Sequence, residues 1–298
     1  MALDKLVDST QLDSDLTSVA NAIRTKGGTS AQLAFPTDFV SAINAISGGG
    51  GYTNDDFADP TKPVGVVVST ATSLLPAMFY QRTGITKFTG NSVTGLNNFN
   101  YAYCHTFYGC TSLEEVELPS LTTLQDRAQV FRGCTSLRKV NLSSVKVLIG
   151  GTVFYGCTSL EGLVLPSAFS DPGNQGTKIN SEWCRNCSSM AYFDTAMAYS
   201  IEANAFNGCT ALNTLVIRHS PNTNAGNICT LLNVNALTGT PFAVGGTGGT
   251  LYVPSAKVSD YQTATNWSTL YNAGTLTVSA IEGSYYETHW ADGTAISS

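Results

Sequence analysis

Two neighbouring carboxylates have a spacing that suits hydrolytic chemistry. Glu115 and Glu117 alternate with Val116 in a segment typical of a β-strand, so both should leave the same face of a sheet. Their Cα atoms would lie about 6.6 Å apart, which glycoside hydrolysis could use. On an open sheet, however, no cleft excludes water from them. We therefore expect no catalysis here, and a glycan hydrolase is the last of the functions considered.

Cysteine and histidine give no stronger chemical signal. Cys184 and Cys187 have the spacing of a redox or zinc pair, but no second pair follows at zinc-finger spacing. The three histidines are scattered along the chain, and none stands beside a nucleophile in a recognisable elbow. We predict no catalytic residue, no metal and no cofactor.

A short repeated phrase explains most of the cysteines. Gly-Cys-Thr-Ser-Leu begins at Gly109, Gly133 and Gly156, and Gly-Cys-Thr-Ala-Leu begins at Gly208. One repeat position is occupied by Cys110, Cys134, Cys157, Cys187 and Cys209. A small apolar residue with a weak donor suits a buried turn, so we predict a structural ladder of free thiols. Such thiols fit synthesis in a reducing compartment.

The repeat period predicts the fold class. Successive repeat cysteines are 24, 23, 30 and 22 residues apart, a period in the low twenties with one longer step. Leucine-rich repeats have a period of roughly 20–29 residues, with one short strand per coil. Strands of successive coils should lie about 4.8 Å apart as a parallel sheet, and the end coils need caps because no coil buries its apolar stripe alone. We predict an α/β repeat fold, a leucine-rich-repeat solenoid of about six coils. Residues 168–178 are interpreted as an inserted loop.

The full phrase Phe-x-Gly-Cys-Thr-Ser-Leu-x-x-Val-x-Leu-Pro resembles the BspA-like class of leucine-rich repeats of bacterial surface antigens. The resemblance runs from about Phe79 to Pro254, and Leu251-Tyr-Val-Pro with Tyr261 and Asn266-Trp267 looks like the closing cap of that class. This resemblance implies extracellular adhesion to proteins or glycans, without chemistry.

The first 47 residues do not repeat. Apolar residues at helical spacing predict two short helices, and a run of glycines from Gly48 to Gly51 predicts a tether. Residues 12–30, with Phe35-Pro36 and residues 39–43, resemble the N-terminal module of tail and fibre proteins from phages of gut Firmicutes. This implies that residues 1–47 attach to other virion proteins. Two short helices bury little alone, so we also expect a homo-oligomer, with a trimer as one form.

Composition narrows the location and the partners. The net charge is −6 and we find neither a basic stripe nor an aromatic platform with basic neighbours, so nucleic acid is not an expected partner. No apolar run reaches ~18 residues, which argues against membrane insertion. The segment after Met1 lacks the pattern of a secretion signal. A virion protein made in the host cytoplasm needs none; the alternative location is the bacterial surface or the extracellular space.

The outward strand positions are the candidates for ligand binding, since solenoids usually bind partners on the exposed face of the sheet. Aromatic residues at period two, from Phe99 to Tyr103, would suit sugar stacking if exposed and strand core if buried. The alternative for every position is a solvated surface. The candidates are Phe99, Tyr101, Tyr103, Glu115, Glu117, Lys139, Asn141, Tyr192, Asp194 and Arg218.

We divide the chain into four segments: a helical attachment module (1–47), a Gly-rich linker (48–63), the solenoid (64–254), and a C-terminal cap and tail (255–298). The predicted function is that of a non-enzymatic phage tail-fibre adhesin recognising a host-surface glycan or protein. Two alternatives remain: a bacterial surface or secreted adhesin, and a purely structural virion decoration or baseplate protein.

Overall fold

The computed structural model describes residues 65–75, 77–96, 105–124, 129–148, 151–166, 178–219 and 228–296. The predicted helical module, the linker, nearly all of the predicted insertion and the aromatic candidates Phe99, Tyr101 and Tyr103 lie outside the described residues.

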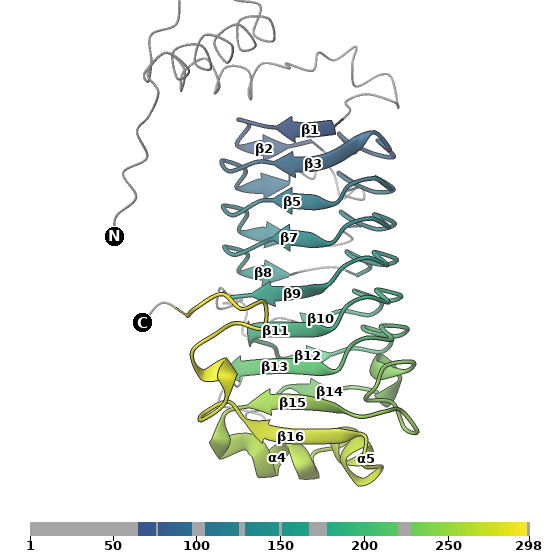
Figure 1. The fold of residues 1–298 in the computed structure, drawn as a ribbon, viewed down its shortest axis with the longest axis vertical. Helices are drawn as coiled ribbons and strands as arrows, with labels where there is room; N and C mark the ends of the chain where they lie inside the picture. Colours follow the sequence, from purple (N-terminus) through teal and green to yellow (C-terminus); the bar gives the residue numbers. More distant parts are fainter. Residues whose placement is uncertain are drawn as a thin grey trace, which may run out of the picture. The chain divides into compact units, whose positions relative to one another are not determined.

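The predicted solenoid with parallel strands is confirmed (Figure 1). Its longer strands form two sheets on one face. The first sheet contains β1 (Gly65–Val68), β3 (Ile85–Thr89), β5 (Glu115–Glu117) and β7 (Lys139–Asn141). The second contains β9 (Gly162–Leu165), β11 (Tyr192–Met197), β13 (Thr214–His219), β15 (Gly249–Val253) and β16 (Leu276–Ala280). All the strand pairs within these sheets are parallel.

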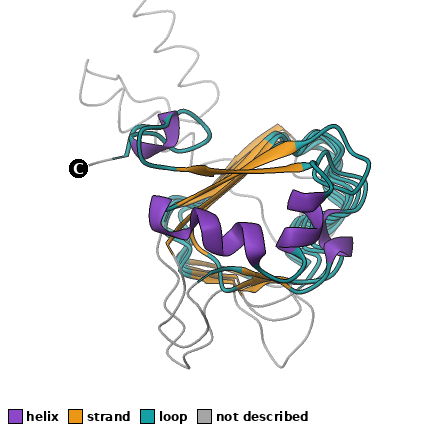
Figure 2. Cartoon of the chain, turned by 90° about the horizontal axis from the view of Figure 1, so that it is seen from below, coloured by secondary structure: helices purple, strands orange, loops and turns teal. Residues whose placement is uncertain are grey.

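Two-residue strands line a second face of the solenoid (Figure 2). They are β2 (Ser73–Leu74), β4 (Gly95–Leu96), β6 (Thr123–Leu124), β8 (Val147–Leu148), β10 (Lys178–Ile179), β12 (Ser200–Ile201) and β14 (Thr230–Leu231). Each is too short to form a sheet without its neighbours, so these strands depend on the stacking of the coils.

The solenoid is longer than the predicted six coils. Strand β1 precedes the first recognisable repeat, and β15 and β16 follow the last one. Neither β15 nor β16 is preceded by the Gly-Cys phrase, yet both continue the parallel register. Pairing requires a free strand edge and an alternating apolar pattern, not the turn sequence, so a count of turn phrases gives too few coils.

A column of aromatic rings fills the interior. Phe79, Phe107, Phe131 and Phe154 stack in order, with ring centroids 5.2, 5.5 and 5.3 Å apart, and all are buried. In the next coil Cys184 occupies the phenylalanine position, and the neighbouring Trp183 continues the column 5.3 Å from Phe154. The interior space is therefore filled in this coil too, although a different residue fills it, as close packing requires.

The predicted thiol ladder is confirmed. All cysteines in the described part of the chain are free and buried. Each repeat thiol donates to the carbonyl at the phenylalanine position of the preceding coil. The bonds are Cys110 to Phe79 (2.9 Å), Cys134 to Phe107 (2.9 Å), Cys157 to Phe131 (3.0 Å), Cys187 to Phe154 (3.0 Å) and Cys209 to Cys184 (3.0 Å).

Burial also raises the pKa of the thiols of Cys184 and Cys187. A thiol that stays protonated in an apolar interior is neither a ready metal ligand nor a nucleophile. This supports a structural role for the pair.

The glycine before each repeat cysteine has a conformational reason. Gly109, Gly133, Gly156 and Gly208 have φ between 69° and 79°, which lies in the left-handed region. In the degenerate coil the same position is held by Asn186, with φ 64°. Asparagine is among the few other residues that tolerate this conformation, which explains why that coil still closes.

Two helices beneath β16, α4 (Val258–Thr263) and α5 (Trp267–Asn272), close the C-terminal end (Figure 1). The short helix η2 (Ser255–Lys257) leads into α4. The helix η1 (Val234–Leu237) belongs to the turn of the coil before β15, where the Ala236 carbonyl accepts from the Phe206 amide. Trp267 Nε1 donates to the Cys229 carbonyl at 2.8 Å, and the Tyr261 hydroxyl accepts from the Cys229 amide at 2.8 Å. These bonds satisfy backbone groups of the last coil that would otherwise be buried without partners. Among the described residues, no helix is long and apolar enough to cross a membrane.

Candidate ligand-binding groove

The outer face of the long strands carries polar side chains, as the alternation predicts. On β5, Val116 is buried, while Glu115 and Glu117 on either side of it are partly exposed. Lys87 Nζ lies 2.6 Å from a Glu115 carboxylate oxygen, and Asn141 Nδ2 donates to Glu117 at 2.8 Å. The bond and charge of Lys87 lower the pKa of Glu115. Cross-strand partners therefore hold both carboxylates in place, and Lys87 also favours the ionised form of Glu115.

The C-terminal tail, residues 282–296, folds back over the outer face of the second sheet (Figure 1). It contains η3 (Tyr285–Glu287) and lies at the edge where the long strands end. Its anchor is a buried ion pair between Asp194 on β11 and Arg218 on β13. Two bonds join them: Nε to Oδ1 at 2.9 Å and Nη2 to Oδ2 at 2.6 Å.

Both partners of the ion pair also bind the tail. Arg218 donates to the carbonyls of Tyr286 and His289 at 2.6 and 2.8 Å, and Asp194 accepts from the Ala291 amide at 2.9 Å. The guanidinium carbon of Arg218 also lies 4.1 Å from the ring centroid of Trp290. The pair therefore joins two strands to a segment far along the chain.

The prediction that Asp194 and Arg218 belong to an exposed binding face is wrong. Their side chains are 0% and 9% exposed, and the outward-pointing Val216 between them is also buried. All three do point outward from the sheet, as the alternation requires, but the tail covers them. Burial raises the pKa of the Asp194 carboxyl, and the bonds from Arg218 and Ala291 act in the opposite direction.

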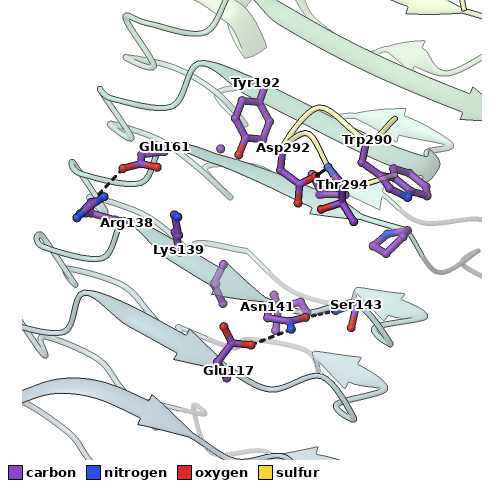
Figure 3. A pocket seen from close by; sticks show the side chains of 15 residues that line it. Glu117, Arg138, Lys139, Asn141, Ser143, Glu161, Tyr192, Trp290, Asp292 and Thr294 are labelled. Carbon is purple, nitrogen blue, oxygen red and sulfur yellow. Dashed lines mark hydrogen bonds and ion pairs between the residues drawn. The ribbon is translucent and has the colours of Figure 1, made fainter. Parts of the chain in front are cut away.

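Beside the tail, the outer face contains a groove of about 570 Å³ (Figure 3). One side and the floor come from β5, β7, β9 and β11, and the other side comes from the tail. Among its lining residues are Glu117, Arg138, Lys139, Asn141, Ser143, Glu161, Gly162, Tyr192, Trp290, Asp292 and Thr294. The expectation of an open sheet without a cleft is therefore wrong, because the folded-back tail supplies the missing wall.

The floor depends on one glycine. Gly162 occupies an outward position of β9, directly paired with Tyr192 on β11. The Tyr192 ring lies over Gly162 so closely that a Cβ at position 162 would overlap the ring carbons. The missing side chain thus lets an aromatic ring lie in the groove instead of being pushed away from the sheet.

The groove is polar and carries charges of both signs. Arg138 Nε and a Glu161 carboxylate oxygen form an ion pair at 3.0 Å, both side chains being about half exposed. Burial, followed by the charges of Asp292, Glu161 and Asp194, raises the pKa of the Tyr192 hydroxyl. Tyr192 is therefore a neutral hydrogen-bond donor with an apolar ring. The arrangement suits recognition of a polar ligand that also has an apolar face.

The structure brings together four of the predicted residues in this groove: Glu117, Lys139, Asn141 and Tyr192. Glu115 lies on the same face but pairs with Lys87. Sequence reasoning missed Arg138, Glu161, Trp290, Asp292 and Thr294. The aromatic and polar composition of residues 284–290 was a signal for Trp290 alone, and it does not say where the tail docks. No local pattern marks Asp292 or Thr294.

A match to a protein-family model supports the fold. The model of the BspA type leucine-rich repeat region matches residues 72–213 and 177–229, with six copies. No curated protein matches the chain. A leucine-rich repeat protein of Treponema pallidum (T. pallidum) is 25% identical over 51% of this chain and 71% of its own, with a TM-score of 0.40.

Two further solved structures are also leucine-rich proteins. A leucine-rich repeat protein of Bacteroides ovatus is 18% identical, with a TM-score of 0.39, over 74% of this chain and 43% of its own. A leucine-rich cell surface protein of Faecalibacterium prausnitzii is 15% identical, with a TM-score of 0.26, over 79% and 83%. The family model covers more than half of the chain and coincides with the observed coils. The chain therefore belongs to the BspA-type leucine-rich repeat family.

Proposed function

We propose that this protein is an extracellular adhesin that binds a cell-surface glycan in the groove beside the C-terminal tail. The observation that carries the proposal is the Tyr192 ring on the groove floor, surrounded by hydrogen-bonding side chains from two strands and the tail. A sugar presents the matching chemistry, with an apolar ring face for stacking and hydroxyl groups around it. Membership in a family of surface-type repeats supports an adhesive role.

The polar residues of the groove can recognise hydroxyl groups from both sides. Glu117 and Asp292 accept hydrogen bonds, whereas Lys139 and the Tyr192 hydroxyl donate them. The cross-strand bond from Asn141 holds the Glu117 carboxylate before any ligand arrives, which lowers the entropic cost of binding.

Binding without catalysis is the form of the proposal that the contacts favour. Glu117 is engaged by Asn141, and Glu161 is engaged by Arg138. A glycosidase needs one free carboxylic acid and one carboxylate placed on either side of the scissile bond. Carboxylates already held by partners are better suited to orienting a ligand.

The test measures binding of the full-length chain to purified cell-wall polysaccharide by isothermal titration calorimetry. Tyr192→Ala is expected to weaken binding about tenfold or more, because an aromatic contact contributes about 0.5–1.5 kcal/mol beyond its buried area. Lys146→Ala, an exposed change elsewhere on the solenoid, is the matched control. Equal affinity of the Tyr192→Ala variant and the parent chain would show that the groove is not the glycan-binding site. Release of reducing ends during the titration would overturn the non-enzymatic role.

The finer proposal, a phage tail fibre, is supported only by the sequence of residues 1–47 and its resemblance to a tail-protein module. In that version residues 1–47 dock on other virion proteins, and homo-oligomers gain avidity by multivalency. A bacterial surface or secreted adhesin uses the same groove without a virion. Neighbouring genes for tail or capsid proteins would favour the virion, and their absence would favour the bacterial adhesin. A chain that binds neither cells nor wall polysaccharide would instead be a structural component.

A further inference from the structure

The turns that precede the long strands carry a second organised surface. In each of five coils one planar side chain stands between the phenylalanine position and the left-handed turn residue. These side chains, which we call the turn-edge row, are Tyr80, Tyr108, Arg132, Tyr155 and Arg185. The turns lie above one another along one side of the solenoid (Figure 2), so the row runs along the solenoid axis.

Neighbours in the row stack on one another. The rings of Tyr80 and Tyr108 are 5.2 Å apart and 18° from parallel. The Arg132 guanidinium carbon lies 6.0 Å from the ring centroid of Tyr108 and 4.6 Å from that of Tyr155, and Arg185 lies 5.8 Å from Tyr155. The expectation that the chain has no aromatic platform with basic neighbours is therefore wrong. One residue per coil forms the platform, so no cluster appears in the linear sequence.

The side chains of the turn-edge row pack against one another through their rings and guanidinium groups and remain partly exposed. The donors that such side chains offer a ligand are phenol hydroxyls and guanidinium N–H groups. Arg185 pairs with Glu182, whereas Arg132 forms no ion pair with any residue that the structure describes. The turn-edge row is thus a line of donors with an uncompensated positive charge in its middle. The stacked rings hold that guanidinium in place, so less entropy is lost when a ligand binds.

We propose that the turn-edge row is a second binding site, which takes a linear polysaccharide bearing carboxylate groups. Its donors recur once per coil, about every 4.8 Å, and therefore match a ligand whose own groups recur along a line. A carboxylate accepts two parallel bonds from a guanidinium edge. A neutral polysaccharide matches less well, because the rings that could stack on a sugar already pack against their neighbours in the row. An acidic peptide places successive side chains on opposite sides when extended, so only alternate ones would reach the row.

This site is separate from the groove. The turns lie where the long strands begin, and the tail that forms the groove wall lies where they end. The two sites would allow one molecule to hold a glycan chain at two points, and either can fail without the other.

The test is calorimetry of the full-length chain with polygalacturonate and with its fully methyl-esterified form, at low and moderate salt. Polygalacturonate is expected to bind, more weakly as salt rises, and the ester to bind at least tenfold more weakly. Arg132→Gln should weaken binding of polygalacturonate about tenfold to a hundredfold, the usual effect of losing charge-assisted bonds. Lys146→Gln removes the same charge from an exposed position off the row and should leave the affinity unchanged.

A second variant distinguishes a loss of binding from a loss of folding. Tyr155→Phe keeps the stack and removes one hydroxyl, so it should weaken binding a few-fold with an unchanged circular dichroism spectrum. The proposal is overturned if polygalacturonate does not bind, if its ester binds equally well, or if Arg132→Gln binds like the parent chain. Tighter binding of polyglutamate than of polygalacturonate would identify an acidic peptide as the partner instead.

Discussion

Replacing Arg218 with methionine should release the C-terminal tail and leave the solenoid folded. Asp194 is 0% exposed and loses both of its guanidinium bonds in this variant, while the carbonyls of Tyr286 and His289 lose their donors. A buried carboxylate left without its partner costs about 3–5 kcal/mol. If the tail lifts away, water reaches Asp194 and this cost disappears. Release of the tail loses only the contacts of a short, partly exposed segment, so it costs less free energy than keeping the Asp194 carboxylate buried without a partner.

Hydrogen–deuterium exchange measured by mass spectrometry checks this expectation. A cost of about 3 kcal/mol corresponds to exchange that is faster by roughly a hundredfold. We expect this in peptides that contain the amides of Trp290, Ala291 and Ile296, which are hydrogen-bonded in the docked tail. Peptides from β11 and β13 should exchange as in the parent chain.

Lys87→Met is the matched control, because it breaks an exposed ion pair on the same face. Such pairs are screened by solvent, so neither the tail nor the sheet should respond. Unchanged exchange of residues 286–296 in Arg218→Met would refute the claim that this ion pair anchors the tail. Faster exchange throughout the solenoid would refute the claim that the tail is a separate, removable layer.

Three further predictions test the repeat and the groove. Gly133→Ala should lower the free energy of unfolding in urea by about 1–2 kcal/mol, because φ at Gly133 is 75°. Gly95→Ala is the control and should have no such effect, because Gly95 has free space around it and no positive φ. Gly162→Ala should displace the Tyr192 ring and weaken glycan binding about as much as Tyr192→Ala does, with the tail still protected from exchange. The free energy of unfolding should fall above about pH 9. Burial raises the pKa of thiols such as Cys187 in the folded state, so the unfolded chain loses these protons first as the pH rises, and stability is lost. A free energy of unfolding that stays constant up to about pH 10.5 would contradict this.

The repeat could be predicted because its causes are local. The alternation around Val116, the glycine that permits a left-handed turn and the cysteine that fits beneath it all lie within about a dozen residues. They recur at a near-constant spacing, so inward and outward positions follow directly. The coils of β15 and β16 lack the turn phrase, so the predicted number of coils was too low for the same reason.

The groove and the turn-edge row could not be predicted in this way. The tail wall depends on contacts between Arg218 and residues about 70 positions later, and nothing in either segment specifies the partner. An outward residue such as Asp194 has the same local pattern whether water or a tail covers it. The turn-edge row requires knowing that single residues more than 20 positions apart stack. Both features depend on tertiary placement rather than on periodicity.

A crystal structure of the chain soaked with an oligosaccharide from a polysaccharide that it binds would show where the glycan lies. We expect a sugar ring against Tyr192, between β7, β9 and the tail, with hydroxyl groups bonded to Glu117, Lys139 or Asp292. Clear density for the sugar on the face of short strands, with the groove empty, would contradict this expectation.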